Sequence, residues 1–396
     1  AGLYRNVHLI TTSDTHIPIW GTHVTTPEVT EDFARVQVET KVKWGSGLGD
    51  DDFLKLKTSI LDPQGKVVAE SENELPRYGG DDVLQTLIVA NPQRWDIKQP
   101  NLYKVRSELS RVERKVKAAH STTTSEEIAY PVDNMTTTFG IRTLEVRADE
   151  GFFLNGRKIK FQGACMHHDL GCLGAAVNTR AIERQLEILK EMGVNGIRTA
   201  HNPPAPELLR LCDRMGFIVM DETFDMWRKR KTTYDYSRYF NEWHERDLTD
   251  HILRDRNHPS VFMWSIGNEV LEQWTHAEAD TLDIQQANLL LNLKRDETAL
   301  AGTDGETMSV NALLTKKLAD IVKSLDPTRP VTTGNNETNP ANHLFRSGAL
   351  DLIGFNYHGY DYKNVPENFP GKPFIAAETT SGLMTRGYCL FYTSSP

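Results

Sequence analysis

The chain has 396 residues and a formal net charge of −9, which disfavours nonspecific binding to nucleic acid or to an anionic membrane. Hydrophobic residues make up 39% and charged residues 25% of the sequence, as in a globular protein with a sizeable core and two or three domains. No apolar run approaches the ~18 residues that a membrane-spanning helix requires. We therefore expect neither nucleic acid nor membrane among the partners.

The sequence up to about residue 145 has the period-two pattern of β-strands. Residues 34–44 alternate apolar with charged or polar side chains, which is typical of a sheet with one solvated face. Asp62-Pro63-Gln64-Gly65 predicts a tight turn between two strand-like runs. We expect a β-sandwich whose last strand lies near Phe139–Val146.

The pattern changes after residue 151, where Leu154-Asn155-Gly156-Arg157 predicts a hairpin turn that opens a second domain. Strands and helices then alternate, as in a parallel α/β fold. The expected strands are Ile159–Gly163, Gly196–Thr199, Phe217–Asp221, Val261–Ile266, Pro330–Thr333, Leu352–Phe355 and Phe374–Ala377. The expected helices cover about 179–192, 206–215, 236–256 and 309–325, and residues 280–306 are expected to form a polar loop insertion.

Seven strands in this alternation favour a (β/α)8 barrel of the TIM type that is truncated before its eighth strand. Residues 385–396 are too few for that strand and its helix. A doubly wound open sheet is the competing architecture, but no glycine-rich phosphate loop follows the first strand.

Two carboxylates close strongly apolar runs, Glu269 after Val261–Asn268 and Glu378 after Pro373–Ala377. The carboxyl ends of barrel strands are the place where such enzymes carry their chemistry. Two carboxylates suffice to cleave a glycosidic bond, with retention of configuration when they lie ~5–5.5 Å apart and inversion at ~6.5–9.5 Å. We therefore predict Glu269 and Glu378 as a catalytic pair.

Other polar residues also follow strands and are candidates for the same site. They are His167-His168-Asp169, Arg198, His201-Asn202, Asp221-Glu222, Asp225 and Asn356-Tyr357-His358. Structural roles are the alternative for these residues. Arg198 is also interpretable as a buried ion-pair partner, and His201 as a helix cap. A metal at His167, His168 and Asp169 is disfavoured, because adjacent residues on an extended chain point opposite ways. Trp227 is the expected sugar platform, whereas Trp264 is expected in the core.

The chain contains four cysteines, Cys165, Cys172, Cys212 and Cys389. They form no metal-ligand spacing, so we expect free, mostly buried thiols, with a disulfide between Cys165 and Cys172 as the less favoured state. The start at Ala1 has neither an initiator methionine nor a signal peptide, as in the interior of a longer protein.

The sequence resembles glycoside hydrolase family 2, the group of β-galactosidases, β-glucuronidases and β-mannosidases. Asn268-Glu269, preceded by Asn257-His258-Pro259-Ser260 and Trp264-Ser265, resembles the acid/base signature of that family. Further resemblances follow in chain order, at Trp95, Pro100-Asn101-Leu102-Tyr103, Phe139-Gly140-Ile141-Arg142, Phe153-Leu154-Asn155-Gly156, Ile197-Arg198 and His201-Asn202-Pro203.

The resemblance implies a retaining mechanism, with Glu269 as general acid/base and Glu378 as nucleophile. It places Arg198 and Tyr357 beside the nucleophile and Asn268 at the sugar 2-hydroxyl. His167 and His201 correspond to glycone-binding histidines, and Asp225, Trp227 and Asn356 complete the expected substrate-binding set. Asp225-Met226-Trp227 departs from the magnesium motif of the best-known β-galactosidases, so no metal and no cofactor is expected.

The resemblance also divides the chain. We expect a remnant of an N-terminal jelly-roll domain and linker at residues 1–25, an immunoglobulin-like sandwich at 26–146 and an incomplete catalytic barrel at 147–396. The predicted activity is exo-acting hydrolysis of terminal β-D-galactosides. Alternatives are β-glucuronidase or β-mannosidase activity, or a catalytically defective carbohydrate-binding fragment. By resemblance, a periplasmic or secreted location is favoured over the cytoplasm. Whether the full-length protein forms a homo-oligomer is left open by the sequence.

Overall fold

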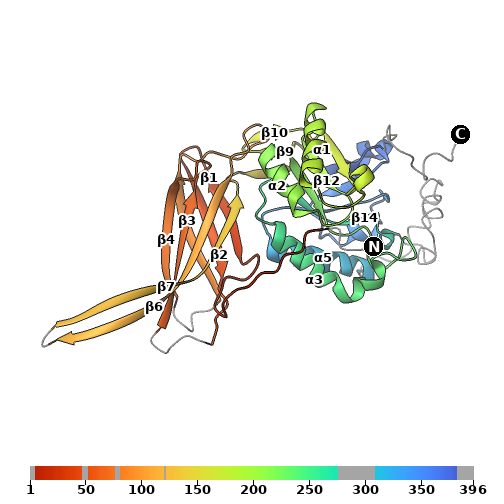
Figure 1. Cartoon of the computed structure of the whole chain (residues 1–396). Coiled ribbons are helices and arrows are strands. Elements are labelled where there is room, and N and C mark those ends of the chain that lie inside the picture. The colour runs from red at the N-terminus through yellow and green to blue at the C-terminus, as the bar shows by residue number, and fades with distance from the viewer. Residues whose placement is uncertain (1–4, 47–51, 76–80, 120–121, 275–307, 381–396) are drawn as a thin grey trace.

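The computed structural model describes residues 5–46, 52–75, 81–119, 122–274 and 308–380. An all-β part and an α/β part lie side by side, coloured red to yellow and green to blue in Figure 1. Cys165, Cys172 and Cys212 carry free thiols, as predicted, although Cys172 is exposed, and Cys389 lies outside the described residues. None of the described helices is long and apolar enough to cross a membrane.

The all-β part is the predicted sandwich of two antiparallel sheets. One sheet has the order β1 (Thr22–Val29), β2 (Phe33–Lys41) and β5 (Asp82–Ala90). The other has the order β4 (Val67–Leu75), β3 (Asp52–Leu61), β6 (Tyr103–Ala119) and β7 (Thr122–Phe139). Ala34, Val36 and Val38 of β2 are buried between the sheets with Ile60 and Val105, so the predicted alternation is confirmed.

The predicted last strand of the sandwich, near Phe139–Val146, is wrong. The strand β7 ends at Phe139, and β8 (Leu144–Arg147) instead pairs with β9 (Gly151–Leu154) in a separate sheet. The chain leaves the sandwich at Gly140, where a Cβ atom would lie only 2.6 Å from a side-chain atom of Pro259. The absence of a side chain at Gly140 therefore permits this close approach to the α/β part.

The predicted hairpin at Asn155-Gly156 is confirmed. It joins β9 to β10 (Arg157–Ile159), with Leu154 paired to Arg157. Asn155 and Gly156 have φ values of 52° and 75°, which suit a two-residue turn with positive φ at both positions.

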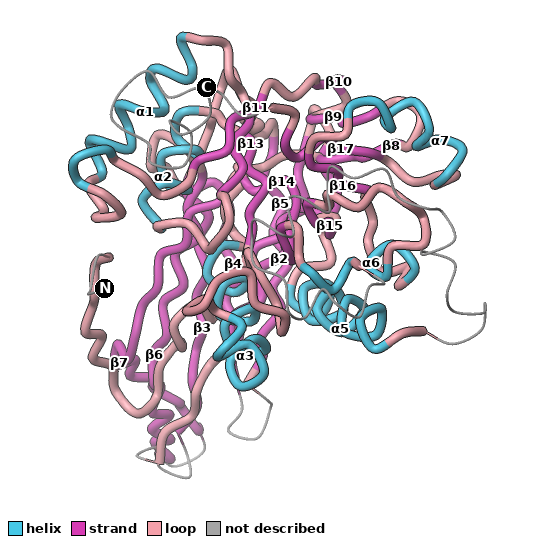
Figure 2. Tube along the Cα trace, turned by 90° about the vertical axis from the view of Figure 1, so that its right-hand side faces the viewer, coloured by secondary structure: helices cyan, strands magenta, loops and turns pink. Residues whose placement is uncertain are grey.

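In the described residues of the α/β part, seven strands run parallel to their sheet neighbours. Figure 2 shows the strands of this part in magenta with helices in cyan around them. Five make one sheet in chain order, β11 (Gly163–Met166), β12 (Gly196–Thr199), β13 (Ile218–Glu222), β14 (Val261–Asn268) and β15 (Val331–Gly334). The strands β16 (Ile353–Asn356) and β17 (Phe374–Glu378) pair with each other, and a bridge from Asn335 to Phe355 joins β15 to β16. Sequential neighbours favour the barrel over a doubly wound sheet, whose strand order reverses at a switch point.

The first predicted strand is misplaced, because Ile159 completes β10 and the parallel strand begins at Gly163. Phe152, Phe161 and Phe262 form an aromatic cluster in the same region, with ring centroids 4.4–5.3 Å apart. The apolar run therefore packs with this cluster before the strand starts. The predicted absence of an eighth strand concerns residues 381–396, which lie outside the described residues.

The four predicted helices are confirmed, and the described residues contain further short helices. The four are α1 (Thr179–Glu191), α2 (Pro206–Met215), α3 (Ser237–Asp255) and α5 (Val310–Leu325), with short α6 (His343–Arg346) and α7 (Val365–Asn368) and 3-10 turns at Gly171–Leu173, Leu271–Gln273 and Gly359–Asn364. The Asn178 side chain caps α1 by accepting from the Ala181 N–H at 3.0 Å. The polar insertion predicted at 280–306 lies outside the described residues.

The sandwich supports the base of β14, the strand that leads to Glu269. The Arg142 guanidinium donates to the carbonyl oxygens of Pro259 and Val261 at 2.6 and 2.8 Å. Asn257 exchanges two hydrogen bonds with the backbone of β1, at Val24 and Thr22. These contacts hold the start of β14 against the sandwich.

Candidate functional site

The predicted site residues converge at the carboxyl ends of the strands. Arg198 is the last residue but one of β12, and Asn268, Asn356 and Glu378 are the last residues of β14, β16 and β17. Because all these strands are parallel, their ends meet on one face of the barrel. The polar contacts of the candidate site lie on that face.

Asn356 joins the two candidate catalytic carboxylates. Its Nδ2 atom donates to Glu269 Oε1 at 3.0 Å and to Glu378 Oε1 at 3.1 Å. Two bonds of 3.0 and 3.1 Å that share one nitrogen keep these two oxygens within about 6.1 Å of each other. The structure thus brings together two glutamates that are far apart in the sequence.

Glu378 lies in an environment that favours its ionised form. Its side chain is 13% exposed, and Arg198 Nη1 donates to its Oε1 at 2.5 Å. Burial alone would raise the pKa of Glu378, but the charge of Arg198 and hydrogen bonds from Tyr357 and Arg198 outweigh burial and lower it below the ordinary value. A carboxylate held in this way is available as a nucleophile.

Glu269 has a different environment. Its backbone takes a left-handed conformation, with φ of 41°, and its N–H donates to the Gly334 carbonyl at 2.7 Å. The neighbouring Asn268 is buried, and its Oδ1 accepts from Arg198 at 2.7 Å. The turn at the end of β14 therefore sets the direction in which the Glu269 carboxylate leaves the strand.

Glu222, named with Asp221 among the strand-end candidates but given no role from the sequence, is a member of the site. It is fully buried, and its Oε2 accepts from Arg198 Nη2 at 2.8 Å and from Ser265 Oγ at 2.6 Å. Its Oε1 lies 2.7 Å from His201 Nδ1. Burial would raise the pKa of Glu222, but Arg198 and His201 outweigh it and lower that pKa. The available signal was its place directly after an apolar strand, which it shares with Glu269 and Glu378.

Asp225 and Lys231 form a second support, beside Asn268. Asp225 Oδ1 accepts from Asn268 Nδ2 at 3.0 Å and from Lys231 Nζ at 2.7 Å. Lys231 also donates to the Asn268 carbonyl at 2.7 Å. Lys231 was missed in the sequence, because it lies in a loop without any strand-end pattern.

The two predicted glycone-binding histidines lie close together. The rings of His167 and His201 meet edge to face, with centroids 5.0 Å apart. His201 Nε2 lies 3.8 Å from Glu378 Oε1. Both imidazoles therefore border the carboxylate pair.

The prediction that Trp227 forms a sugar platform is wrong. Its side chain is fully buried, its Nε1 donates to the Ile266 carbonyl at 2.8 Å, and its ring stacks on Phe240. Its two faces are enclosed by protein, so neither is open to a pyranose. The prediction that Trp264 belongs to the core is confirmed, since it is 1% exposed and its Nε1 donates to Asp326.

Among the described residues, three metal-ligating side chains gather at Asp221, His251 and Asp255 rather than at His167, His168 and Asp169. All three are buried, and His251 Nε2 lies 3.2 Å from a carboxylate oxygen of each aspartate. Burial opposes the charge of His251, but the two carboxylates outweigh it and raise the pKa of His251. Close packing of one buried imidazole against two carboxylates accounts for this cluster.

Comparison with known proteins matches two family models. Residues 144–388 match the TIM barrel domain of glycosyl hydrolases family 2, and residues 15–124 match another domain of glycosyl hydrolases family 2. The beta-galactosidase BoGH2A of Bacteroides ovatus is 58% identical over 98% of this chain and 43% of its own length. A putative beta-glucuronidase of Formosa agariphila is 30% identical over 98% of this chain and 30% of its own length.

Solved structures of glycosidases also match this chain. A glycosyl hydrolase family 2 member from Bacteroides cellulosilyticus matches 93% of this chain and 41% of its own, with a TM-score of 0.75 and 35% identity. A beta-glycosidase from Bacteroides vulgatus matches 95% of this chain and 40% of its own, with a TM-score of 0.72 and 30% identity. The chain thus spans less than half of the length of these relatives.

Proposed function

The chain belongs to glycoside hydrolase family 2, and from this premise we propose that the whole protein is a retaining exo-β-glycosidase that releases terminal β-D-galactose. The relative at 58% identity, over nearly all of this chain, is named a beta-galactosidase. The match supports galactose as the sugar, and the site geometry supports the mechanism.

The observation that carries the proposal is the Glu269–Asn356–Glu378 arrangement. The two oxygens that share the Asn356 amide lie within about 6.1 Å of each other. Inverting enzymes need ~6.5–9.5 Å between their carboxyl groups, to admit a water between carboxylate and sugar. The limit joins one oxygen of each carboxylate and accords with the retaining spacing of ~5–5.5 Å, so together with membership of the family it supports double displacement through a covalent intermediate.

In the proposed reaction, Glu378 attacks the anomeric carbon while Glu269 donates a proton to the departing glycosidic oxygen. The bond from the anomeric carbon to that oxygen breaks, and a glycosyl ester forms on Glu378. Glu269, now ionised, takes a proton from water, whose oxygen then displaces Glu378. The lowered pKa of Glu378 supports the nucleophile role.

The substrate-binding roles are proposals as well. Asn268 is proposed to bind the sugar 2-hydroxyl, and Arg198 and Tyr357 to hold Glu378 ionised. His167 and His201 are proposed to bind the glycone. Asp225 and Asn356 hold Asn268 through its amide, so they are proposed to act on the sugar through that residue. The proposal uses neither a metal nor a cofactor.

The domain division into residues 1–25, 26–146 and 147–396 is also part of the proposal. The family matches at 15–124 and 144–388 support a sandwich followed by a barrel. The second boundary falls within β8, which pairs with β9 of the α/β part.

A β-glucuronidase is the second candidate, because the Formosa agariphila relative carries that name as a putative function. A panel of 4-nitrophenyl β-galactoside, β-glucuronide and β-mannoside on the full-length protein separates the candidates. We expect the galactoside to have the highest kcat/KM. Absence of galactoside turnover would reject the proposal, and absence of turnover on all three would favour a carbohydrate-binding role.

A further inference from the structure

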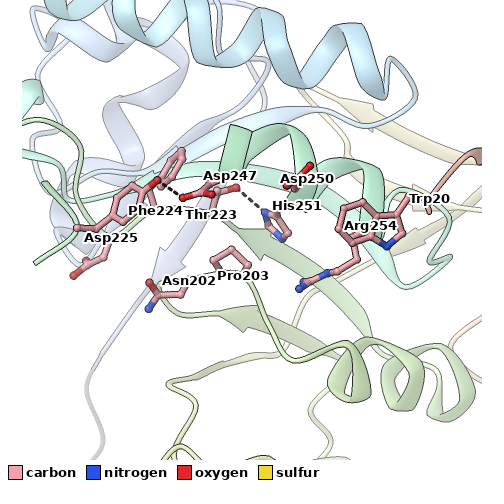
Figure 3. A pocket seen from close by; sticks show the side chains of 11 residues that line it. Trp20, Asn202, Pro203, Thr223, Phe224, Asp225, Asp247, Asp250, His251 and Arg254 are labelled. Atoms are coloured by element: carbon pink, nitrogen blue, oxygen red, sulfur yellow. Dashed lines mark hydrogen bonds between the residues drawn. The ribbon is translucent and has the colours of Figure 1, made fainter. Parts of the chain in front are cut away.

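A cavity of about 250 Å³ lies beside the proposed active site. It is bordered by residues of helix α3 and of the loops that follow β12 and β13, and Figure 3 draws their side chains as sticks. Its wall includes an aromatic ring, Trp20, and polar groups from Asn202, Asp225, Asp250 and Arg254. The mechanism of bond cleavage leaves most of these groups without a role.

Trp20 reaches the cavity from an unusual backbone conformation. It is the third residue of a turn closed by the Gly21 N–H, which donates to the Pro18 carbonyl at 2.8 Å. Its φ is 57°, in the left-handed region that favours glycine and is unfavourable for a bulky side chain. Strained residues of this kind cluster at binding sites, where the surroundings hold them. The conformation delivers an indole to the cavity wall.

The polar groups suit a ligand rich in hydroxyls. The Nε atom of Arg246 lies 3.7 Å from Oδ2 of Asp250, which is beyond hydrogen-bond distance. The carboxylate oxygens of Asp250 can therefore accept hydrogen bonds from a hydroxyl. Asn202 offers both a donor and an acceptor. An aromatic face next to such groups fits a pyranose, which presents an apolar face and a ring of hydroxyls.

Asp225 connects this cavity to the proposed active site. Its side chain lines the cavity, and its Oδ1 accepts from Asn268 Nδ2 at 3.0 Å. Asn268 immediately precedes Glu269 in the chain. In the view of Figure 3, Asp225 and Trp20 stand at opposite ends of the cavity. The Asp225 end of the cavity therefore lies next to Asn268, and Trp20 stands at the other end.

We propose that this cavity is a saccharide subsite, which binds a further sugar unit of the oligosaccharide whose terminal residue is cleaved. Trp20 stacks on the apolar face of that unit, and Asp250 and Asn202 bond its hydroxyls. The inference rests on the proposed glycosidase activity and extends it to the choice of substrate. A longer oligosaccharide gains contacts here that a simple aryl glycoside lacks.

The test uses the full-length protein and the substitution Trp20→Gly, which removes the indole and suits the positive φ. The matched control is Ile19→Ala, in the same turn, where the side chain is 56% exposed. Each protein is assayed on 4-nitrophenyl β-galactoside and on β-galactose-terminated oligosaccharides of two to four units with different linkages. Melting temperatures are measured alongside.

For Trp20→Gly we expect kcat/KM on at least one oligosaccharide to fall about tenfold more than kcat/KM on the aryl galactoside. The fall should come mainly from a higher KM. The melting temperature should not fall, and Ile19→Ala should show no selective loss. The subsite alone would be overturned if Trp20→Gly changed kcat/KM by the same factor on every substrate. It would also be overturned if the unmodified protein cleaved the aryl galactoside but none of the oligosaccharides. If the unmodified protein fails on the aryl galactoside too, the proposed function falls and the subsite with it.

Discussion

Arg198 and Glu222 form an ion pair in the interior of the barrel, with Nη2 and Oε2 2.8 Å apart and side-chain exposures of 4% and 0%. The same guanidinium donates to Glu378 through Nη1. Burial would lower the pKa of Arg198, but the two carboxylates outweigh it and raise that pKa above its ordinary value. One cation thus serves a structural carboxylate and the proposed nucleophile.

The first prediction concerns Glu222→Gln. Breaking a buried ion pair from one side typically costs ~3–5 kcal/mol, because the remaining charge is left buried and uncompensated. We expect the free energy of unfolding to fall by about this amount, and kcat/KM to fall at least about tenfold as Arg198 and His201 lose their support. Urea denaturation and steady-state kinetics measure the two effects.

The control for this prediction is Glu187→Gln, which removes an ion pair with Arg180 at the surface. Its side chains are 43% and 64% exposed, and such pairs contribute ~0–1 kcal/mol. If Glu222→Gln were no more harmful than Glu187→Gln, the support role of Glu222 would be refuted.

The second prediction concerns pH. The pKa of Glu378 is lowered in the folded protein, so this carboxylate stabilises the fold above its unfolded pKa and the contribution is lost as pH falls through the folded pKa. As the proposed nucleophile, Glu378 acts in its ionised form, so we expect kcat/KM to fall as the pH falls through the folded pKa. Tyr357→Phe removes a hydrogen bond to that form, so the acid limb of kcat/KM should move to higher pH, by up to about one unit.

The measurement is a pH profile of kcat/KM on 4-nitrophenyl β-galactoside. Tyr360→Phe provides the control, because that side chain is 69% exposed and should leave the acid limb in place. An acid limb that is the same in Tyr357→Phe and in the unmodified protein would show that Tyr357 does not support the ionised nucleophile.

The sequence predicted the strand-end residues well, because each lies directly after a short apolar run. This local signal located Glu269, Glu378, Arg198 and Asn356 at the face where the structure has them. It could not show that Glu222 pairs with Arg198, since that contact depends on the parallel register of β12 and β13. Contacts across strands are set by register, which a single sequence does not display.

The wrong predictions have a related cause. A tryptophan in a loop after a strand looks exposed in the sequence, but Trp227 folds back to bond the Ile266 carbonyl of the neighbouring strand. Likewise, β8 has the pattern of a sandwich strand and yet pairs with β9, after the chain passes close to Pro259 at Gly140. Tertiary contacts decided both cases.

The third prediction follows from the burial of Trp227. Trp227→Ala should lower the free energy of unfolding by ~3–5 kcal/mol, as for large-to-small changes in a core. Trp227→Phe, which keeps a ring against Phe240, should retain KM. Tyr234→Ala, at a side chain 82% exposed, serves as control and should change stability little. A raised KM in Trp227→Phe without loss of stability would restore the sugar-platform role.

The last prediction separates the roles of the two carboxylates. Glu378→Ala should lower kcat by about four orders of magnitude or more, since no covalent intermediate can form. Azide, placed where the carboxylate was, can then attack the anomeric carbon and displace the aglycone directly. A single displacement on a β-galactoside inverts the centre, so the product should be α-galactosyl azide.

Glu269→Ala should behave differently. The ester on Glu378 still forms from substrates with good leaving groups, so the loss should be greatest for poor leaving groups. Azide then attacks that ester in place of water, and two successive inversions produce β-galactosyl azide. Proton NMR of the anomeric signal distinguishes the two azides. If the products were exchanged between the variants, the assignment of nucleophile and acid/base would be reversed; if azide rescued neither variant, double displacement itself would be in question.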